Sequence, residues 1–441
     1  MSVAHPLRTS TALLVLAFIL SGAGQTAHAA PVKGTAPASE AHEAPAAQAF
    51  RAGLQALINN KPDEARKAFD SSLKLDPKHV PALLGMATLD LSSRRNKEAR
   101  SWLARAEAAA PQSAEVHLAW GRFHLAEKRP ADAEQALQKA IALNPQAVPA
   151  RLELGDLYLA QPGRAADALK AFQATAALAP DNRFALYGLG ASAALNGKVE
   201  EALLAFQRCT ELAPKDPAPW RAIGRLHLER GAVDKALTAF DSGLQRLPDF
   251  LPLMLDRVDA LGGLRRWDDA LKQLQAAAKA DPKSADVLLK RADVLQGMQR
   301  WSDAERAYLD TIERAPAQPL AYNNLAWMTL VRGGGDAKKA VDWARKAVSL
   351  SPRSSPFHDT LGWAERAAGR LDAAAASLQK AIALEGNVAG YHLHLGIVRA
   401  EQNQKAAARS SLERAIALDP QGDKGSTGTE ARKRLLALGA G

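Results

Sequence analysis

The sequence has a single cysteine, Cys209, and only 10 histidines among its 441 residues. One cysteine cannot form a disulfide bond within the chain. The histidines show no spacing typical of a metal site, and His392 and His394, two residues apart, would point away from each other on a helix. We therefore predict neither a metal site nor a fold that depends on disulfide bonds.

Motifs of catalysis are also missing. The chain contains no Gly-x-Ser-x-Gly, no His-Glu-x-x-His and no dinucleotide-binding fingerprint. The triplet at residues 333–335, Gly-Gly-Gly, lacks the Lys-Ser/Thr that would follow it in a phosphate-binding loop, and we interpret it as a loose turn. We predict that the protein is not an enzyme and that it uses no cofactor.

The charge balance shows no strong excess of either sign. There are 57 Lys and Arg residues against 47 Asp and Glu residues, a formal net charge of +10. Opposite charges lie side by side, as in Asp63-Glu64 and Arg66-Lys67, and no basic stripe contains interleaved aromatic residues. This distribution argues against a nucleic-acid partner, although mild attraction to acidic glycans stays compatible with it.

Only one stretch near the N-terminus is strongly apolar, Thr11–Leu20, and it is shorter than the roughly 17–25 residues of a membrane span. Arg8 precedes it, and the small-x-small sequence Ala27-His28-Ala29 follows it. This pattern predicts a cleavable signal peptide over residues 1–30, and an uncleaved anchor is the alternative. The export signal predicts a periplasmic or secreted protein without a membrane span after cleavage. Residues 31–45 are rich in Ala and Pro without periodicity, which predicts a disordered linker.

The remainder of the chain is dominated by repetition at 34 residues. Alanines keep this spacing, apart from one extra residue before position 168 and two before position 340: Ala65, Ala99, Ala133, Ala168, Ala202, Ala236, Ala270, Ala304, Ala340, Ala374 and Ala408. A large apolar residue follows most of these alanines by four positions, and a proline follows nearly all of them by twelve. A fixed period of this length indicates stacked structural repeats.

This order of alanine, apolar residue and proline resembles the tetratricopeptide repeat family. The resemblance covers about residues 46–420 in about eleven units, and it implies an all-α, right-handed superhelical solenoid of helix–turn–helix units. Residues 421–441 would add a linker and a C-terminal capping helix, with Thr429 as its N-cap and Leu435, Leu436 and Leu438 covering the last unit.

The unit at residues 183–216 shows why the repeat folds in this way. Leu186, Leu189 and Gly190 share one side of a first helix, and Ala202 and Phe206 share one side of a second. Small residues at positions 190 and 202 allow two helix backbones to approach, and the phenylalanine ring fills the adjacent space. Cys209 replaces an alanine found at this place in other units, so we predict that it is buried.

In this family the first helix of each unit lines a concave groove, so the resemblance assigns partner binding to these helices. The candidate contact residues are Tyr187, Arg221, Arg225, Asn323, Trp327, Asp359 and Trp363. Asn323 and Trp327 are four residues apart, and Asp359 and Trp363 repeat this arrangement on the next first helix. The two tryptophans would form an exposed shelf for a protein or a sugar ring, or would pack between neighbouring helices.

The arginine pair also has two interpretations. Arg221 and Arg225 carry like charge on one helix face, and they would hold a carboxylate or a phosphate of a partner. Alternatively, Arg225 would pair with Asp259 of the next unit. Tyr187 would extend an aromatic wall along the groove.

These observations predict an adaptor or scaffold that binds protein partners of the cell envelope. Its paired units at residues 323–327 and 359–363 resemble those of bacterial envelope repeat proteins, which implies a machine such as exopolysaccharide export or pilus assembly. The alternative is a glycan-binding protein that uses Trp327 and Trp363 as stacking platforms.

Overall fold

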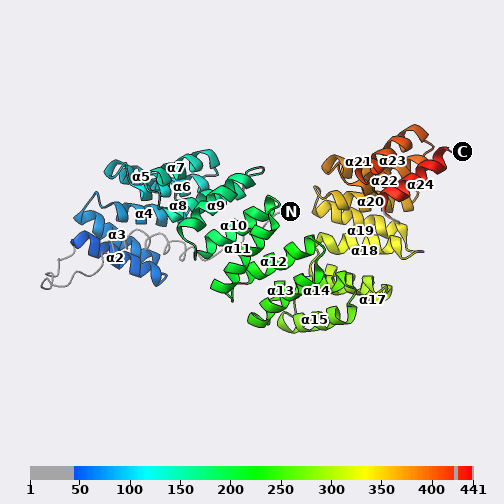
Figure 1. Ribbon diagram of the computed structural model, residues 1–441, viewed down its shortest axis with the longest axis horizontal. Helices are drawn as coiled ribbons and strands as arrows, with labels where there is room; N and C mark the ends of the chain where they lie inside the picture. Colours follow the sequence, from blue (N-terminus) through cyan, green and yellow to red (C-terminus); the bar gives the residue numbers. More distant parts are fainter. Residues whose placement is uncertain (1–43, 422–425, 440–441) are drawn as a thin grey trace. The chain divides into compact units, whose positions relative to one another are not determined.

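The computed structural model describes residues 44–421 and 426–439, which form 23 α-helices and no β-strand (Figure 1). The prediction of an all-α fold is confirmed. The predicted signal peptide at 1–30 and most of the predicted linker at 31–45 lie outside the described residues. None of the described helices is both long enough and apolar enough to cross a bilayer.

The chain divides into two compact units, with the boundary between Ala213 and Pro214. The first unit contains five helix pairs: α2 (Pro45–Ile58), α3 (Pro62–Leu75), α4 (Val80–Ser92), α5 (Asn96–Ala109), α6 (Ala114–Ala126), α7 (Pro130–Leu143), α8 (Val148–Leu159), α9 (Ala165–Leu178), α10 (Arg183–Leu195) and α11 (Val199–Leu212).

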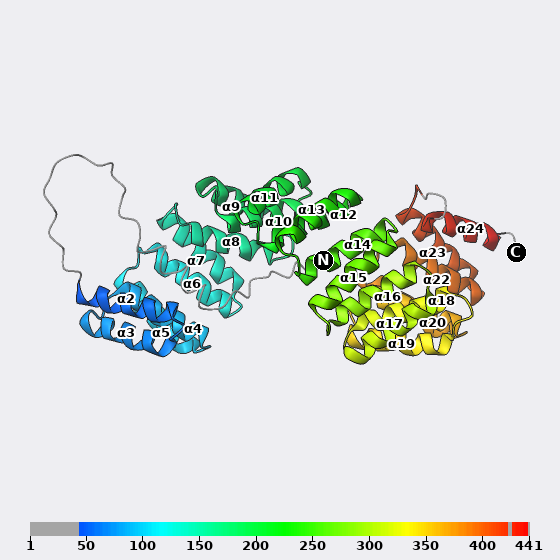
Figure 2. The same cartoon turned by 90° about the horizontal axis from the view of Figure 1, so that it is seen from below.

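The second unit contains six pairs and one further helix: α12 (Pro217–Glu229), α13 (Val233–Arg246), α14 (Leu251–Gly263), α15 (Trp267–Ala280), α16 (Ala285–Gly297), α17 (Trp301–Arg314), α18 (Pro319–Val331), α19 (Ala337–Leu350), α20 (Ser355–Ala367), α21 (Leu371–Leu384), α22 (Ala389–Glu401), α23 (Lys405–Leu418) and α24 (Thr427–Gly439). Within each unit, every first helix packs against its own second helix, and consecutive pairs stack, as both views show (Figures 1 and 2).

The turn between the two helices of a pair has the same backbone device throughout. A residue in the left-handed conformation follows every first helix, such as Asn60 after α2 and Gly369 after α20. This conformation lets the last carbonyls of the helix accept hydrogen bonds and reverses the chain. In the two longer turns, glycines take the position, at Gly163 and at Gly333 and Gly334.

The alanine series predicted from the 34-residue period forms the centre of the core, and each of its members has no exposed surface. The large residue four positions later is also buried, with Phe69, Phe172, Phe240 and Tyr308 among the largest fully buried side chains. Close approach at the small positions is confirmed, because a Cβ atom added to Gly190 would lie 2.6 Å from the Phe206 ring. Cys209 is buried, as predicted.

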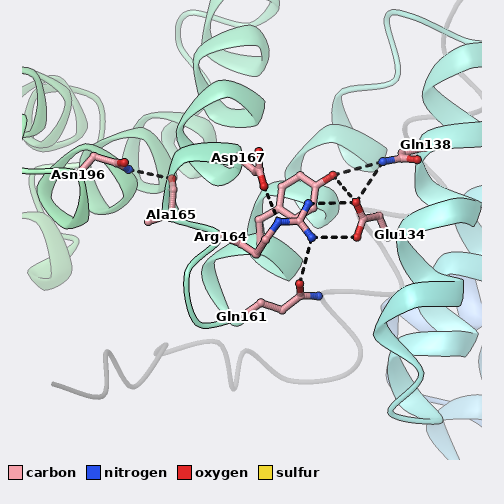
Figure 3. A network of polar contacts seen from close by, with 8 residues as sticks. Glu134, Gln138, Gln161, Arg164, Ala165, Asp167 and Asn196 are labelled. Carbon is pink, nitrogen blue, oxygen red and sulfur yellow. Dashed lines mark hydrogen bonds and ion pairs between the residues drawn. The ribbon is translucent and has the colours of Figure 1, made fainter.

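The extra residue of the fourth pair is accommodated by a polar clasp at the turn between α8 and α9 (Figure 3). Arg164 pairs with Glu134 of α7 through its Nη2 atom at 3.2 Å and with Asp167 of α9. Its guanidinium group also lies 4.3 Å from the centre of the Tyr158 ring. These contacts hold the pKa of the Glu134 carboxyl below its ordinary value, mainly through the hydrogen bond from Arg164. The clasp fixes the longer turn to the preceding pair.

The last helix, α24, begins at Thr427, two residues before the expected cap Thr429. Ala431 is buried, and Leu435 and Leu438 pack against the apolar cluster that includes Leu412. Leu436 is exposed, so the expectation that it covers the last pair is wrong. Two leucines rather than three lie against the cluster because residues 435 and 438 share a helix face that residue 436 does not.

Candidate partner-binding surface

The first helices of the pairs form the inner layer of each unit. Successive first helices contact one another, as α12 contacts α14 and α18 contacts α20, whereas the described second helices have no comparable contacts among themselves. We call the side of the first helices that faces away from the second helices the inner face. A predicted contact residue can bind a partner only if its side chain is exposed on the inner face and is not already paired within the chain.

Arg221 and Arg225 on α12 do not stand free on the inner face. Arg221 Nε donates to Asp256 Oδ2 at 2.6 Å, and Arg225 Nη2 donates to Asp256 Oδ1 at 2.8 Å. Asp256 lies on α14, and its side chain is 9% exposed. The alternative pairing of Arg225 with Asp259 is wrong, because Asp259 pairs with Lys290 of α16. One carboxylate therefore holds both arginines against the next repeat.

A second polar contact joins α16, α17 and α18. Asp293 Oδ1 accepts hydrogen bonds from the Tyr308 hydroxyl at 2.7 Å and from Asn324 Nδ2 at 2.9 Å. Burial raises the pKa of the Asp293 carboxyl above its ordinary value, and these two donors oppose the shift. Burial also raises the pKa of the Tyr308 hydroxyl. Asp293 is thus committed to contacts within the protein.

Four of the contacts between consecutive first helices share a spacing that the sequence analysis missed. The partners lie 31 residues apart on consecutive first helices, one repeat minus three residues. This spacing joins Arg225 to Asp256, Asp259 to Lys290, Asp293 to Asn324 and, in the first unit, Arg122 to Glu153. Residues of complementary charge or hydrogen-bonding type, 31 positions apart in the sequence, could have revealed these pairs. Comparison at the repeat length of 34 residues aligns equivalent positions, which are not the positions in contact.

Asp359 and Trp363 on α20 are engaged by the next first helix, α22. Asp359 Oδ1 lies 2.7 Å from His394 Nδ1, and the His394 ring stacks on Trp363 with 4.3 Å between ring centres. Arg366 also lies over the Trp363 ring, 4.4 Å from its centre, and Arg366 Nε donates to Glu401 at 2.9 Å. Trp363 is half-buried, so it does not form the exposed shelf considered above.

Asn323 and Trp327 on α18 have a different environment. Both side chains are half-buried. Asn323 Nδ2 donates to Asn324 Oδ1 at 3.2 Å, but the buried oxygen Asn323 Oδ1 accepts no hydrogen bond from any described residue. On the same helix, Leu320 is 45% exposed and Val331 is 47% exposed. Open apolar surface therefore lies at both ends of α18, whereas the unpaired oxygen of Asn323 is buried within the chain.

Tyr187 belongs to the first unit, on α10. It is half-buried, and its ring lies 5.4 Å from that of Phe206. Phe184, at the start of the same helix, is exposed, and the Arg183 guanidinium group lies over its ring. The structure thus places Phe184, rather than Tyr187, as the more open aromatic residue of α10.

The described part of the chain contains no group of three or more His, Cys, Asp or Glu side chains arranged to hold a metal ion. The buried carboxylates that are described have other partners. Asp90 accepts hydrogen bonds from Arg66 and from the Trp102 indole, at 2.5 and 2.9 Å. Such contacts connect repeats to one another.

Comparison with known proteins agrees with this architecture. Two tetratricopeptide repeat models match the chain, one at residues 56–120 and 124–192 and the other at 196–249, 255–295, 289–355 and 360–423. A search of curated protein sequences finds no significant match.

Among solved structures, yeast Tom70 is 15% identical with a TM-score of 0.52, and the match covers 90% of this chain and 96% of that chain. A tetratricopeptide repeat protein from Parabacteroides merdae is 18% identical with a TM-score of 0.45, over 65% of this chain and 99% of that chain. The pilF protein of Pseudomonas aeruginosa is 20% identical with a TM-score of 0.41, over 46% and 91%. These likenesses concern the fold.

Proposed function

The chain belongs to the tetratricopeptide repeat family, whose repeats serve as scaffolds for protein interaction, and we propose that it is a periplasmic adaptor of a cell-envelope assembly machine. The periplasmic location rests on the signal-like sequence at residues 1–30. The machine would be one such as exopolysaccharide export or pilus assembly, as the resemblance of the paired units at 323–327 and 359–363 suggests.

The inner face of α18 is the observation that carries the proposal. Other first helices of the second unit bind one another through inner polar groups, as Arg225 and Asp256 do. On α18, Leu320 and Val331 are open to solvent. Exposed apolar residues beside a half-buried tryptophan are typical of protein-binding surfaces.

In-cell photocrosslinking tests the adaptor function. A photoreactive amino acid is placed at Leu320 or at Val331, with the exposed Glu313 of the outer helix α17 as control. We expect one envelope protein to be captured from both inner positions and not from Glu313. Equal capture from all three sites, or none from the inner sites, would contradict the proposal. N-terminal sequencing of the protein recovered from the periplasm tests the location, with cleavage expected near Ala29.

The glycan-binding alternative has weaker support. Sugar rings stack on an open aromatic face, but His394 and Arg366 both lie against the Trp363 ring. Trp327 is the remaining candidate platform. Titration with neutral and acidic oligosaccharides, followed by tryptophan fluorescence, decides this alternative. A response that the Trp327→Leu variant abolishes would favour glycan binding over the adaptor function.

A further inference from the structure

We propose that the inner face of α18 docks an amphipathic α-helix of the partner, with its axis along α18. This inference rests on the proposed adaptor function and adds the shape and the chemistry of the bound segment. It concerns four residues of α18: Leu320, Asn323, Trp327 and Val331.

These four residues form one stripe. They lie at positions i, i+3, i+7 and i+11, which share a side of an α-helix, and they extend over about 16 Å at about 1.5 Å per residue. The two ends, Leu320 and Val331, are the most exposed apolar residues of α18. The stripe is long enough for three turns of a partner helix.

The direction of the open surface favours a helix over an extended peptide. An extended segment that crosses successive first helices would contact α16, α18 and α20 at one level. At the level of Trp327, however, Asp293 of α16 is bound to Tyr308 and Asn324, and Trp363 of α20 is covered by His394. The open apolar surface therefore continues along α18 rather than across it, which suits a helix with apolar residues every three or four positions.

The chemistry of the stripe defines the contacting face of this helix. No residue of α18 is charged, so a charged group of the partner buried there would lose its hydration without gaining a counter-ion. The unpaired Asn323 Oδ1 is buried within the chain and offers the partner no acceptor, so the contacting face of the partner helix is apolar.

The flank of the stripe adds one charge. Asp286 on α16 is exposed and lies one repeat before Leu320, at the same level of the neighbouring first helix. It favours a Lys or Arg beside the apolar face of the partner helix. The inferred ligand is an amphipathic helix with an uncharged apolar face and a basic flank.

Two displayed peptide libraries test this inference on the purified full chain. One library presents a stable helix with randomised positions at i, i+4, i+7 and i+11 and along one flank, and the other presents unstructured peptides of equal length. We expect the helical library to be enriched in clones with apolar faces and basic flanks. These clones should bind the L320D/V331D double variant at least about tenfold more weakly, as expected for the loss of apolar contacts at both ends of the stripe.

The matched control is Leu309→Asp on α17, because Leu309 is 43% exposed, close to the value for Leu320. It should leave binding unchanged, and circular dichroism should show that all variants keep their helix content. Enrichment of unstructured peptides alone, or equal binding to the double variant, would overturn the inference. Sedimentation would also overturn it if the chain formed a dimer that the double variant dissolved, because a second copy would then be the occupant. If a partner were crosslinked only at other positions of the inner face, the adaptor function would be supported and the proposed site on α18 would be wrong.

Discussion

The helices α12 and α18 present equivalent positions of the repeat to the inner face, but they use them in opposite ways. Arg221 and Arg225 of α12 correspond to Asn323 and Trp327 of α18, three repeats later. Both arginines bind Asp256 of the next first helix. The α18 pair has no such anchor, and Asn323 Oδ1 is unpaired. A position in the repeat thus gives the direction of a side chain, whereas the residues 31 to 35 positions later, on the next first helix, decide whether it is free to meet a partner.

The largest effect is expected from breaking the anchor of α12. Asp256→Ala leaves the partly buried Arg221 without its counter-charge, and we expect a loss of about 2 kcal/mol in local stability, less than for a fully buried pair because Arg225 is 57% exposed. Hydrogen exchange of the α12 and α14 amides measures this loss, because repeat arrays open locally. Asp259→Ala is the control, because its pair with Lys290 is more exposed and should contribute about 0.5 kcal/mol. Equal losses of local stability in Asp256→Ala and Asp259→Ala would show that Asp256 is not a stronger anchor than Asp259.

The comparison of α12 with α18 also shows which features could be predicted from the sequence. The period predicted the helix pairs and the buried alanines correctly, because eleven repetitions constrain the same small positions in the same way. It did not identify Asp256 as the partner of Arg225. A side chain on one first helix contacts a residue of the next first helix that lies three positions before its own equivalent, as Asp256 lies three positions before Asp259. Matching by period therefore selects Asp259.

The tryptophans show a second limit. Trp327 and Trp363 occupy equivalent positions, so the period treats them alike. His394, 31 residues after Trp363, covers its ring, whereas the equivalent residue for Trp327 is Thr360, 33 residues later because this repeat has two extra residues. Exposure depends here on a neighbouring side chain rather than on the repeat position, which is why the candidate site was harder to predict than the fold.

The second prediction concerns the buried carboxylate beside α18. Because the pKa of Asp293 is raised in the folded protein, the folded state binds more protons than the unfolded state between the ordinary pKa and the raised one. The contribution of Asp293 to stability is thus largest at low pH and is lost as the pH rises through the folded pKa. Asp293→Asn should remove this dependence and should stabilise the protein at pH 7 by about 1 kcal/mol.

Urea denaturation of the wild type and the Asp293→Asn variant at pH 5 and pH 7 checks this effect, since the difference between the two proteins cancels the titration of other groups. The variant should gain more at pH 7 than at pH 5. A gain that is the same at both pH values would contradict a raised pKa of Asp293, and a loss at pH 7 would show that Tyr308 and Asn324 stabilise the carboxylate as an anion.

The smallest effect is expected at Asn323, and it sharpens the comparison most. Asn323→Leu gives up the hydrogen bond to Asn324 but also removes the unpaired oxygen, so stability should change by less than about 0.5 kcal/mol. Arg221→Leu, at the equivalent position of α12, should cost about 1 kcal/mol, because Asp256 then keeps only Arg225. If Asn323→Leu were as destabilising as Arg221→Leu in hydrogen exchange, Asn323 would serve the fold. If Asn323→Leu leaves stability unchanged while Arg221→Leu lowers it, this repeat position anchors the next repeat in α12 and does not do so in α18.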